Sequence, residues 1–185
     1  MEPEIARHFW YALQTRLRYE QFAALHLRSK GYEPFLPVYT CRRPWADRIK
    51  KIEMPLFPGY LFCRFDVLNR LPILVTPGII QVVGSGKTPI PIQDTEISAI
   101  QAVVQSGLPR QPWPFLQLGE KVRIACGPLG GHEGILLNVK GNHRLVLSVS
   151  LLRRSVAVEI DSAWVSPISS RSGAVSGAPV LSQAS

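Results

Sequence analysis

The sequence predicts an α+β protein with two domains, a helix-backed antiparallel sheet followed by a small β-barrel. Three observations support this prediction. Strand-like and helix-like segments alternate in the first half, short strand-like runs separated by glycine-containing turns occupy residues 120–160, and a proline-rich segment lies between the two halves. Mixed strands and helices are typical of α+β domains, and evenly spaced short strands are typical of small barrels.

The first elements follow from local composition. Residues 9–14 are rich in aromatic side chains and predict a strand. Residues 19–30 contain good helix formers, and Gly31 is placed to adopt the left-handed conformation that ends many helices. Residues 32–40 predict extended chain at a sheet edge, because they contain two prolines.

Further strands and a second helix complete the first domain. Residues 55–65 and 79–83 predict strands. Asp94 begins a helix that Gly107 ends, with Ile97, Ile100 and Val104 on one side. The order β-α-β-β-α, with a fourth short strand, predicts an antiparallel sheet with helices on one side.

The second half predicts four strands, at residues 120–126, 133–139, 143–150 and 154–160. We expect domains at residues 7–107 and 118–167, joined by a semi-rigid linker at 108–117 and followed by a disordered tail at 168–185. We also expect the two domains to be independent, with the C-terminal one folding alone as a β-barrel; the alternative is that the C-terminal domain masks a binding site on the first domain.

The charge predicts a polyanionic partner, because 21 Lys and Arg residues outnumber 13 Asp and Glu residues, for a net charge of +8. Residues 41–51 predict a hairpin tip with five cations and one anion. This tip is either a solvated loop or a nucleic-acid-binding element, in which an indole stacks on bases and cations hold phosphates. The candidate residues there are Arg42, Arg43, Trp45, Arg48, Lys50 and Lys51.

A second candidate contact to nucleic acid lies at the start of the first helix. Arg16 and Arg18 flank this end, where cations oppose the helix dipole and a phosphate would be a natural partner. His26 lies within the helix and is either a packed residue or a ligand contact.

Sequence patterns typical of enzymes and metal sites are not found. The chain has no GxSxG, Walker, GxGxxG or HExxH motif, so we expect no enzyme, no cofactor and no metal. Three widely spaced cysteines (Cys41, Cys63 and Cys126) fit a reducing cytoplasm better than disulfides or zinc. No run approaches the roughly 18–20 apolar residues of a spanning helix, and the N-terminus lacks a signal-peptide pattern, so we expect no membrane partner.

The strand at residues 60–65 predicts an open aromatic face. Because side chains alternate across a sheet, Leu61, Cys63 and Phe65 form one face, which helices should cover. Tyr60 and Phe62 point the other way, together with Trp10 or Tyr11. Either a partner docks on this face, or chain segments containing Trp113 and Phe115 fold over it.

Several of these segments resemble one family. Trp10-Tyr-Ala-Leu-Gln-Thr15, Pro55-Leu-Phe-Pro-Gly-Tyr-Leu-Phe62 and Ile90-Pro-Ile-Gln-Asp94 resemble the N-terminal (NGN) domain of NusG-type transcription elongation factors. Residues 118–124 and 127–134 resemble the KOW domain that ends those proteins. The Pro-Leu-Phe-Pro-Gly-Tyr-Leu-Phe run and the basic hairpin are similar to those of specialised paralogues (RfaH, LoaP and the UpxY group).

The resemblance implies a transcription elongation or antitermination factor that suppresses pausing. The aromatic face, with Trp10, Phe57, Tyr60 and Phe62, would dock on the β′ clamp helices of RNA polymerase, and contact with the β subunit is also implied. Positions matching Arg16 and His26 touch non-template DNA in the specialised paralogues, although Phe22 replaces a basic residue there. The stretch with Leu151, Leu152 and Arg153 matches the family's site for a small-subunit ribosomal protein or Rho, Rho being disfavoured by the bulk and charge of Arg153.

Two other functions stay open. The aromatic face could stack bases of nascent or free RNA, and the KOW barrel could bind ribosomal RNA. Only one cation, Arg64, lies within the strand at residues 60–65, which favours a protein partner. We expect a cytoplasmic monomer that binds polymerase and nucleic acid.

Overall fold

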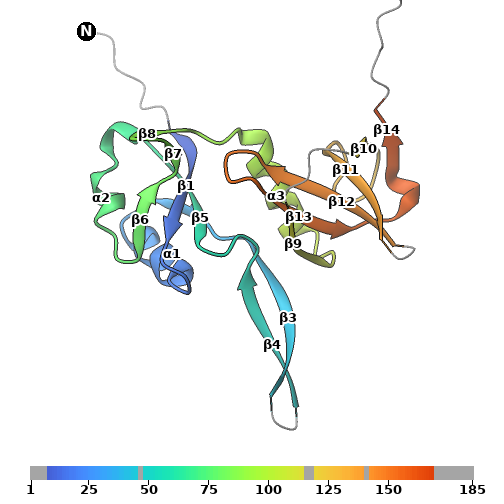
Figure 1. Cartoon of the computed structure of the whole chain (residues 1–185), viewed down its shortest axis with the longest axis horizontal. Helices are drawn as coiled ribbons and strands as arrows, with labels where there is room; N and C mark the ends of the chain where they lie inside the picture. Colours follow the sequence, from blue (N-terminus) through green and yellow to red (C-terminus); the bar gives the residue numbers. More distant parts are fainter. Residues whose placement is uncertain (1–7, 46–47, 115–118, 140–141, 169–185) are drawn as a thin grey trace, which may run out of the picture.

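The computed structural model describes residues 8–45, 48–114, 119–139 and 142–168 of the chain. Its first sheet has four antiparallel strands in the order β2-β5-β1-β6 (Figure 1). The strands are β1 Phe9–Thr15, β2 Glu33–Phe35, β5 Tyr60–Phe65 and β6 Ile79–Val82. The predicted α+β class is confirmed.

Two helices cover one face of this sheet. They are α1 Glu20–Ser29 and the short α2 Leu71–Leu74, and a 3-10 turn, Val67–Asn69, precedes α2. Their side of the sheet carries Leu61, Cys63 and Phe65, all essentially inaccessible to water, as the alternation predicted. Gly31 follows α1 with a φ of 84°, which confirms its predicted role at the helix end.

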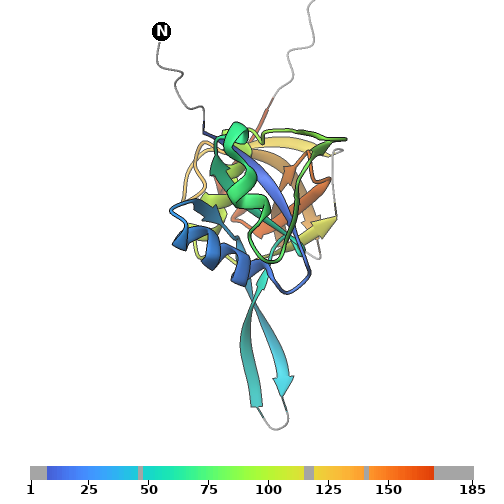
Figure 2. The same cartoon turned by 90° about the vertical axis from the view of Figure 1, so that its left-hand side faces the viewer.

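A long hairpin projects from the first domain in both views (Figures 1 and 2). Its strands are β3 Val38–Trp45 and β4 Arg48–Pro55, which pair in unbroken register from Val38 and Pro55 to Trp45 and Arg48. A smaller hairpin, β7 Gly84–Ser85 and β8 Thr88–Pro89, leads to helix α3 Asp94–Gln105. The basic segment therefore belongs to a hairpin, as predicted.

The second sheet has six antiparallel strands in the order β14-β10-β11-β12-β13-β9. A 3-10 turn, Ser162–Trp164, precedes its last strand. The strands are β9 Arg110–Pro114, β10 Glu120–Ile124, β11 Glu133–Val139, β12 Asn142–Val149, β13 Arg154–Glu159 and β14 Val165–Pro167. The four strands predicted for this half are present.

The predicted linker differs from the structure. Residues 110–114, inside the expected 108–117 segment, form strand β9 and pair with β13 along its length. Proline disfavours a central strand, but an edge strand needs donors on one side only, so it tolerates prolines at alternate positions. Phe115 and residues 169–185 of the predicted 168–185 tail lie outside the described residues.

The two domains share one hydrophobic core, so the expectation of independent domains is not met in this structure. Side chains of the first sheet and of α3 form a single buried cluster with Val122, Ile124, Leu145 and Leu147 of the second sheet. Helix α3 contacts β12 of the second sheet and β1 of the first (Figure 1). The second face of the first sheet is therefore covered.

Candidate functional site

A buried carboxylate fixes the turn that enters β5. Glu20 is 3% exposed, and its Oε1 accepts a hydrogen bond of 2.8 Å from the backbone N–H of Gly59. The Gly59 carbonyl accepts a 2.8 Å hydrogen bond from the backbone N–H of Thr15. Gly59 has a φ of 82°, a left-handed backbone conformation that favours glycine. The turn at Gly59 therefore positions Phe57, which precedes it, and Tyr60, which follows it. Sequence reasoning missed Glu20, because a carboxylate in a first helical turn ordinarily faces water.

The predicted aromatic residues lie together on the second face of the sheet. Trp10, Phe57 and Phe62 are 6%, 1% and 0% exposed, whereas Tyr60 is half-buried. Phe62 contacts Phe57 edge-on, with 5.4 Å between ring centroids, and stacks on Phe35 at 6.1 Å. The structure selects Trp10, since Tyr11 packs on the helical side. Phe35 was missed, because a three-residue strand has too few positions to show a period.

The C-terminal domain covers this aromatic face. Leu151 and Leu152, between β12 and β13, are half-buried against the same cluster as Phe57 and Phe62. The Arg154 guanidinium lies over the Tyr60 ring, 5.4 Å from its centroid. Residues predicted for polymerase binding and residues predicted for KOW partner binding therefore meet in one interface. The expectation of an open face is wrong for this structure.

The segment that covers the aromatic face also differs from the predicted alternative, a chain segment containing Trp113. Trp113 does not lie on this face. It packs on the outer side of the second sheet, against Ile135, Val146 and Ala157. The cover is the C-terminal domain itself, whose apolar side chains belong to the same buried cluster as Phe57 and Phe62.

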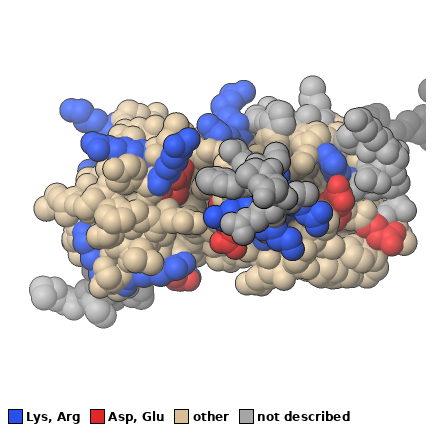
Figure 3. Space-filling model, turned by 90° about the horizontal axis from the view of Figure 1, so that it is seen from below, with Lys and Arg blue, Asp and Glu red and all other residues tan. Residues whose placement is uncertain are grey.

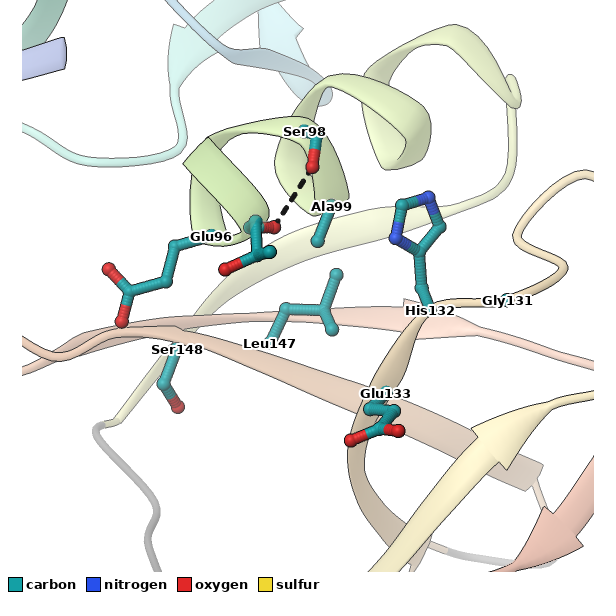
Figure 4. A pocket seen from close by; sticks show the side chains of 9 residues that line it. Glu96, Ser98, Ala99, Gly131, His132, Glu133, Leu147 and Ser148 are labelled. Carbon is teal, nitrogen blue, oxygen red and sulfur yellow. Dashed lines mark hydrogen bonds between the residues drawn. The ribbon is translucent and has the colours of Figure 1, made fainter. Parts of the chain in front are cut away.

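Polar groups border the interface beside helix α3. The Glu96 Oε1 accepts a 3.2 Å hydrogen bond from the backbone N–H of Ser150. A pocket of about 480 Å³ lies between α3 and the second sheet, where Ala99 and Leu147 face each other while His132 and Glu133 come from the sheet side (Figure 4). Glu133 is paired with Arg123. The pocket marks incomplete closure at the junction of the domains.

The exposed surface of α1 carries the second set of predicted residues. Arg16 and Arg18 are exposed, and Arg18 adopts a φ of 70°. Phe22 is 46% exposed, and its ring centroid lies 4.1 Å from that of the half-buried His26. Exposed cations therefore precede α1, and an aromatic pair lies on the exposed side of the helix itself.

The long hairpin carries the third set. In Figure 3 it points toward the viewer, and Lys and Arg side chains gather around it. Arg42, Lys50 and Lys51 are exposed, and the register places Arg42 opposite Lys51. The side chains of Arg43, Trp45 and Arg48 lie outside the described part of the structure. The solvated-loop interpretation is therefore untested, although the described cations are accessible.

Reactive and metal-binding groups do not converge in the described residues. Burial raises the pKa of the Cys63 thiol to about 12, so it stays protonated at neutral pH. Across residues 8–168, leaving out the undescribed gaps, no cluster of three or more His, Cys, Asp or Glu side chains could hold a metal ion. The described helices include none with the length and hydrophobicity of a membrane-spanning segment.

Comparison with known proteins agrees with this architecture. Residues 8–101 match the family model described as transcription termination factor NusG. The transcription termination/antitermination protein NusG of Yersinia pestis is 31% identical over 173 residues, covering 85% of this chain and 95% of the relative. The protein of the same name from Helicobacter pylori J99 is 27% identical over 164 residues, covering 82% of this chain and 93% of the relative.

A solved structure titled "Domain interaction in Thermotoga maritima NusG" has the same fold. It superimposes with a TM-score of 0.57 at 19% identity, covering 88% of this chain and 98% of that one. This likeness supports an NGN domain followed by a KOW domain. From the family model and the Yersinia relative together, the chain belongs to the NusG family, whose members are transcription factors that bind RNA polymerase and are not enzymes.

Proposed function

We propose that this protein docks on the β′ clamp helices of RNA polymerase through its aromatic face and acts as an elongation or antitermination factor. One observation supports this most strongly. An apolar aromatic face contacts an apolar segment of the C-terminal domain, and each contains residues matched to a binding site of the family. Exposed apolar surfaces are unfavourable in water, so two protein-binding surfaces without their partners would be expected to pack against each other.

Docking then requires the C-terminal domain to move away from the first sheet. Phe62 and Phe57 are inaccessible while the domains are closed. The same opening would free Leu151 and Leu152 for a small-subunit ribosomal protein, with Rho the less favoured partner because Arg153 adds charge. Polymerase therefore selects the open state, and its affinity falls with the fraction of chains that are closed.

The test measures co-purification of RNA polymerase with the tagged full-length chain. Tyr60→Ala removes a half-buried aromatic from the docking face and should reduce bound polymerase at least ten-fold, since anchor aromatics often contribute about 2 kcal/mol or more. Arg154→Ala removes the side chain that covers Tyr60 and should increase it. Lys121→Ala, which removes an exposed cation elsewhere in the C-terminal domain, is the control. Wild-type binding by Tyr60→Ala would contradict the assignment.

We further propose that α1 binds the non-template DNA strand, as in a specialised member of the family acting in the cytoplasm as a monomer. The exposed Phe22 ring, paired with His26, and the two exposed arginines that precede α1 support this, because aromatic rings stack on unpaired bases and arginines hold phosphates. In anisotropy titrations with single-stranded DNA, Phe22→Ala should weaken binding without changing its salt dependence. Arg16→Ala should reduce the log-log salt slope by about 0.7. Identical effects of the two variants would refute this division of roles.

A further inference from the structure

Among the strands that the structure describes, β9 pairs with β13 alone, so one of its two edges is used. The Pro109 carbonyl accepts a 3.0 Å hydrogen bond from Glu159, and the register continues without a break to Pro114 opposite Arg154. In antiparallel pairing, alternate residues direct both backbone groups at the partner strand. Gln111 and Trp113 therefore face β13. Residues 110, 112 and 114 face away, so the two prolines within β9 remove no donor from the ladder.

The same prolines protect the outer edge of β9. Two of its three outward positions lack an N–H, which leaves little for a further strand to pair with. The inner edge pairs with β13 along all five residues of β9. Residues 155–158 of β13 are each 1% exposed. Trp113 adds packing against Ile135, Val146 and Ala157, and the Arg144 guanidinium lies 5.5 Å from the centroid of its ring. Strand β9 thus occupies β13 in the manner of a bound extended peptide.

Strand β9 is also attached to the first domain. The Arg110 Nε donates a 3.0 Å hydrogen bond to the Val38 carbonyl at the base of the long hairpin. Leu108, just before β9, packs against the core that the two domains share. One five-residue strand therefore contacts both domains at once.

Pairing of β9 limits how far the domains can separate. Helix α3 ends at Gln105 and β10 begins at Glu120. With β9 paired, only residues 106–109 connect α3 to the second sheet, a reach of at most about 14 Å. With β9 released, residues 106–119 form the connection and reach at most about 50 Å.

We propose that β9 is a displaceable latch, an intramolecular strand whose release from β13 both frees that sheet edge for an extended segment of another protein and lengthens the tether so that the aromatic face can open. The part concerning the aromatic face rests on the proposed docking function. The part concerning the β13 edge stands on the strand pairing alone. A competing strand would need backbone donors at the positions facing β13 and a large apolar side chain in the place of Trp113.

Gln111→Pro tests the latch in the full-length chain, because it places a proline at a position that faces β13. Gln111→Ala is the matched control, which keeps the backbone N–H. In the proline variant, amide hydrogen exchange at Ser155 and Ala157 should be at least ten-fold faster, and the radius of gyration from X-ray scattering should increase. Trp113→Thr is a second variant, which keeps every backbone donor and serves in case the proline variant folds poorly. It should also speed amide exchange at Ser155 and Ala157 and increase the radius of gyration.

A synthetic peptide of residues 108–114, Leu-Pro-Arg-Gln-Pro-Trp-Pro, is the probe for the freed edge. It should bind Gln111→Pro saturably and restore the slow exchange of Ser155 and Ala157, but should not bind the wild-type chain or Gln111→Ala. Unchanged exchange in both Gln111→Pro and Trp113→Thr would overturn the latch. Faster exchange in Gln111→Pro would also overturn it if the peptide did not bind or if the radius of gyration did not change. None of these readouts involves polymerase, so failure of the docking proposal would leave them unaffected.

Discussion

Replacement of Glu20 tests whether a buried carboxylate determines the shape of the docking face. The Glu20 Oε1 is the hydrogen-bond acceptor for the Gly59 N–H at 2.8 Å, in a site where the glutamate is 3% exposed. Glu20→Ala leaves that N–H without its partner inside the protein. Hydrogen bonds to charged groups contribute about 1.5–3 kcal/mol, so the first domain should lose free energy of unfolding in that range.

Thermal unfolding followed by circular dichroism is the assay. For a chain of this length each kcal/mol lowers the midpoint by about 2–4 °C, so Glu20→Ala should unfold about 3–12 °C earlier than the wild type. Glu20→Gln retains an uncharged acceptor and should lose about 1 kcal/mol. Gln21→Ala, an exposed change in the same helical turn, should stay within about 0.5 kcal/mol of the wild type.

A wild-type midpoint for Glu20→Ala would refute the reasoning, because the Gly59 turn would then be stable without its acceptor. Equal losses for Glu20→Ala and Gln21→Ala would refute it as well, since the effect would then belong to helix α1 and not to the turn.

Three further predictions follow from burial and charge. Phe62→Ala should lower the free energy of unfolding by about 3–5 kcal/mol in denaturant titrations, because the ring is fully buried, whereas Tyr60→Ala should lower it by less than half as much. Burial raises the pKa of Cys63 from 9.0 to about 12, so the unfolded chain loses this proton first and stability should fall as pH rises from 9 toward 12. Cys63→Ala should flatten that fall in urea titrations, and a slope equal to the wild type's would contradict it. Neutralising Arg42, Lys50 and Lys51 together should reduce the log-log salt slope of DNA binding by about 2–3, and an unchanged slope would make the hairpin a solvated loop.

Local patterns in the sequence determined the elements and the division of each strand between two faces. The alternation in residues 60–65 separates Leu61, Cys63 and Phe65 from Tyr60 and Phe62, and the structure keeps that separation. Gly31 predicted the end of α1, and the Asp94 start of α3 is observed. These features depend on backbone conformation and on side-chain period, which neighbouring residues specify by themselves.

Contacts between distant residues were decided only in the tertiary structure. The period of β5 does not reveal that Leu151 and Leu152 would pack against the same cluster as the aromatic face, nor that Glu20 would bind the Gly59 N–H across 39 positions of sequence. The prolines at 112 and 114 predicted a linker, because proline is unfavourable in a strand with two neighbours. A strand with one neighbour leaves alternate N–H groups unused, and only the packing of the whole chain determines whether a segment has one neighbour, two or none.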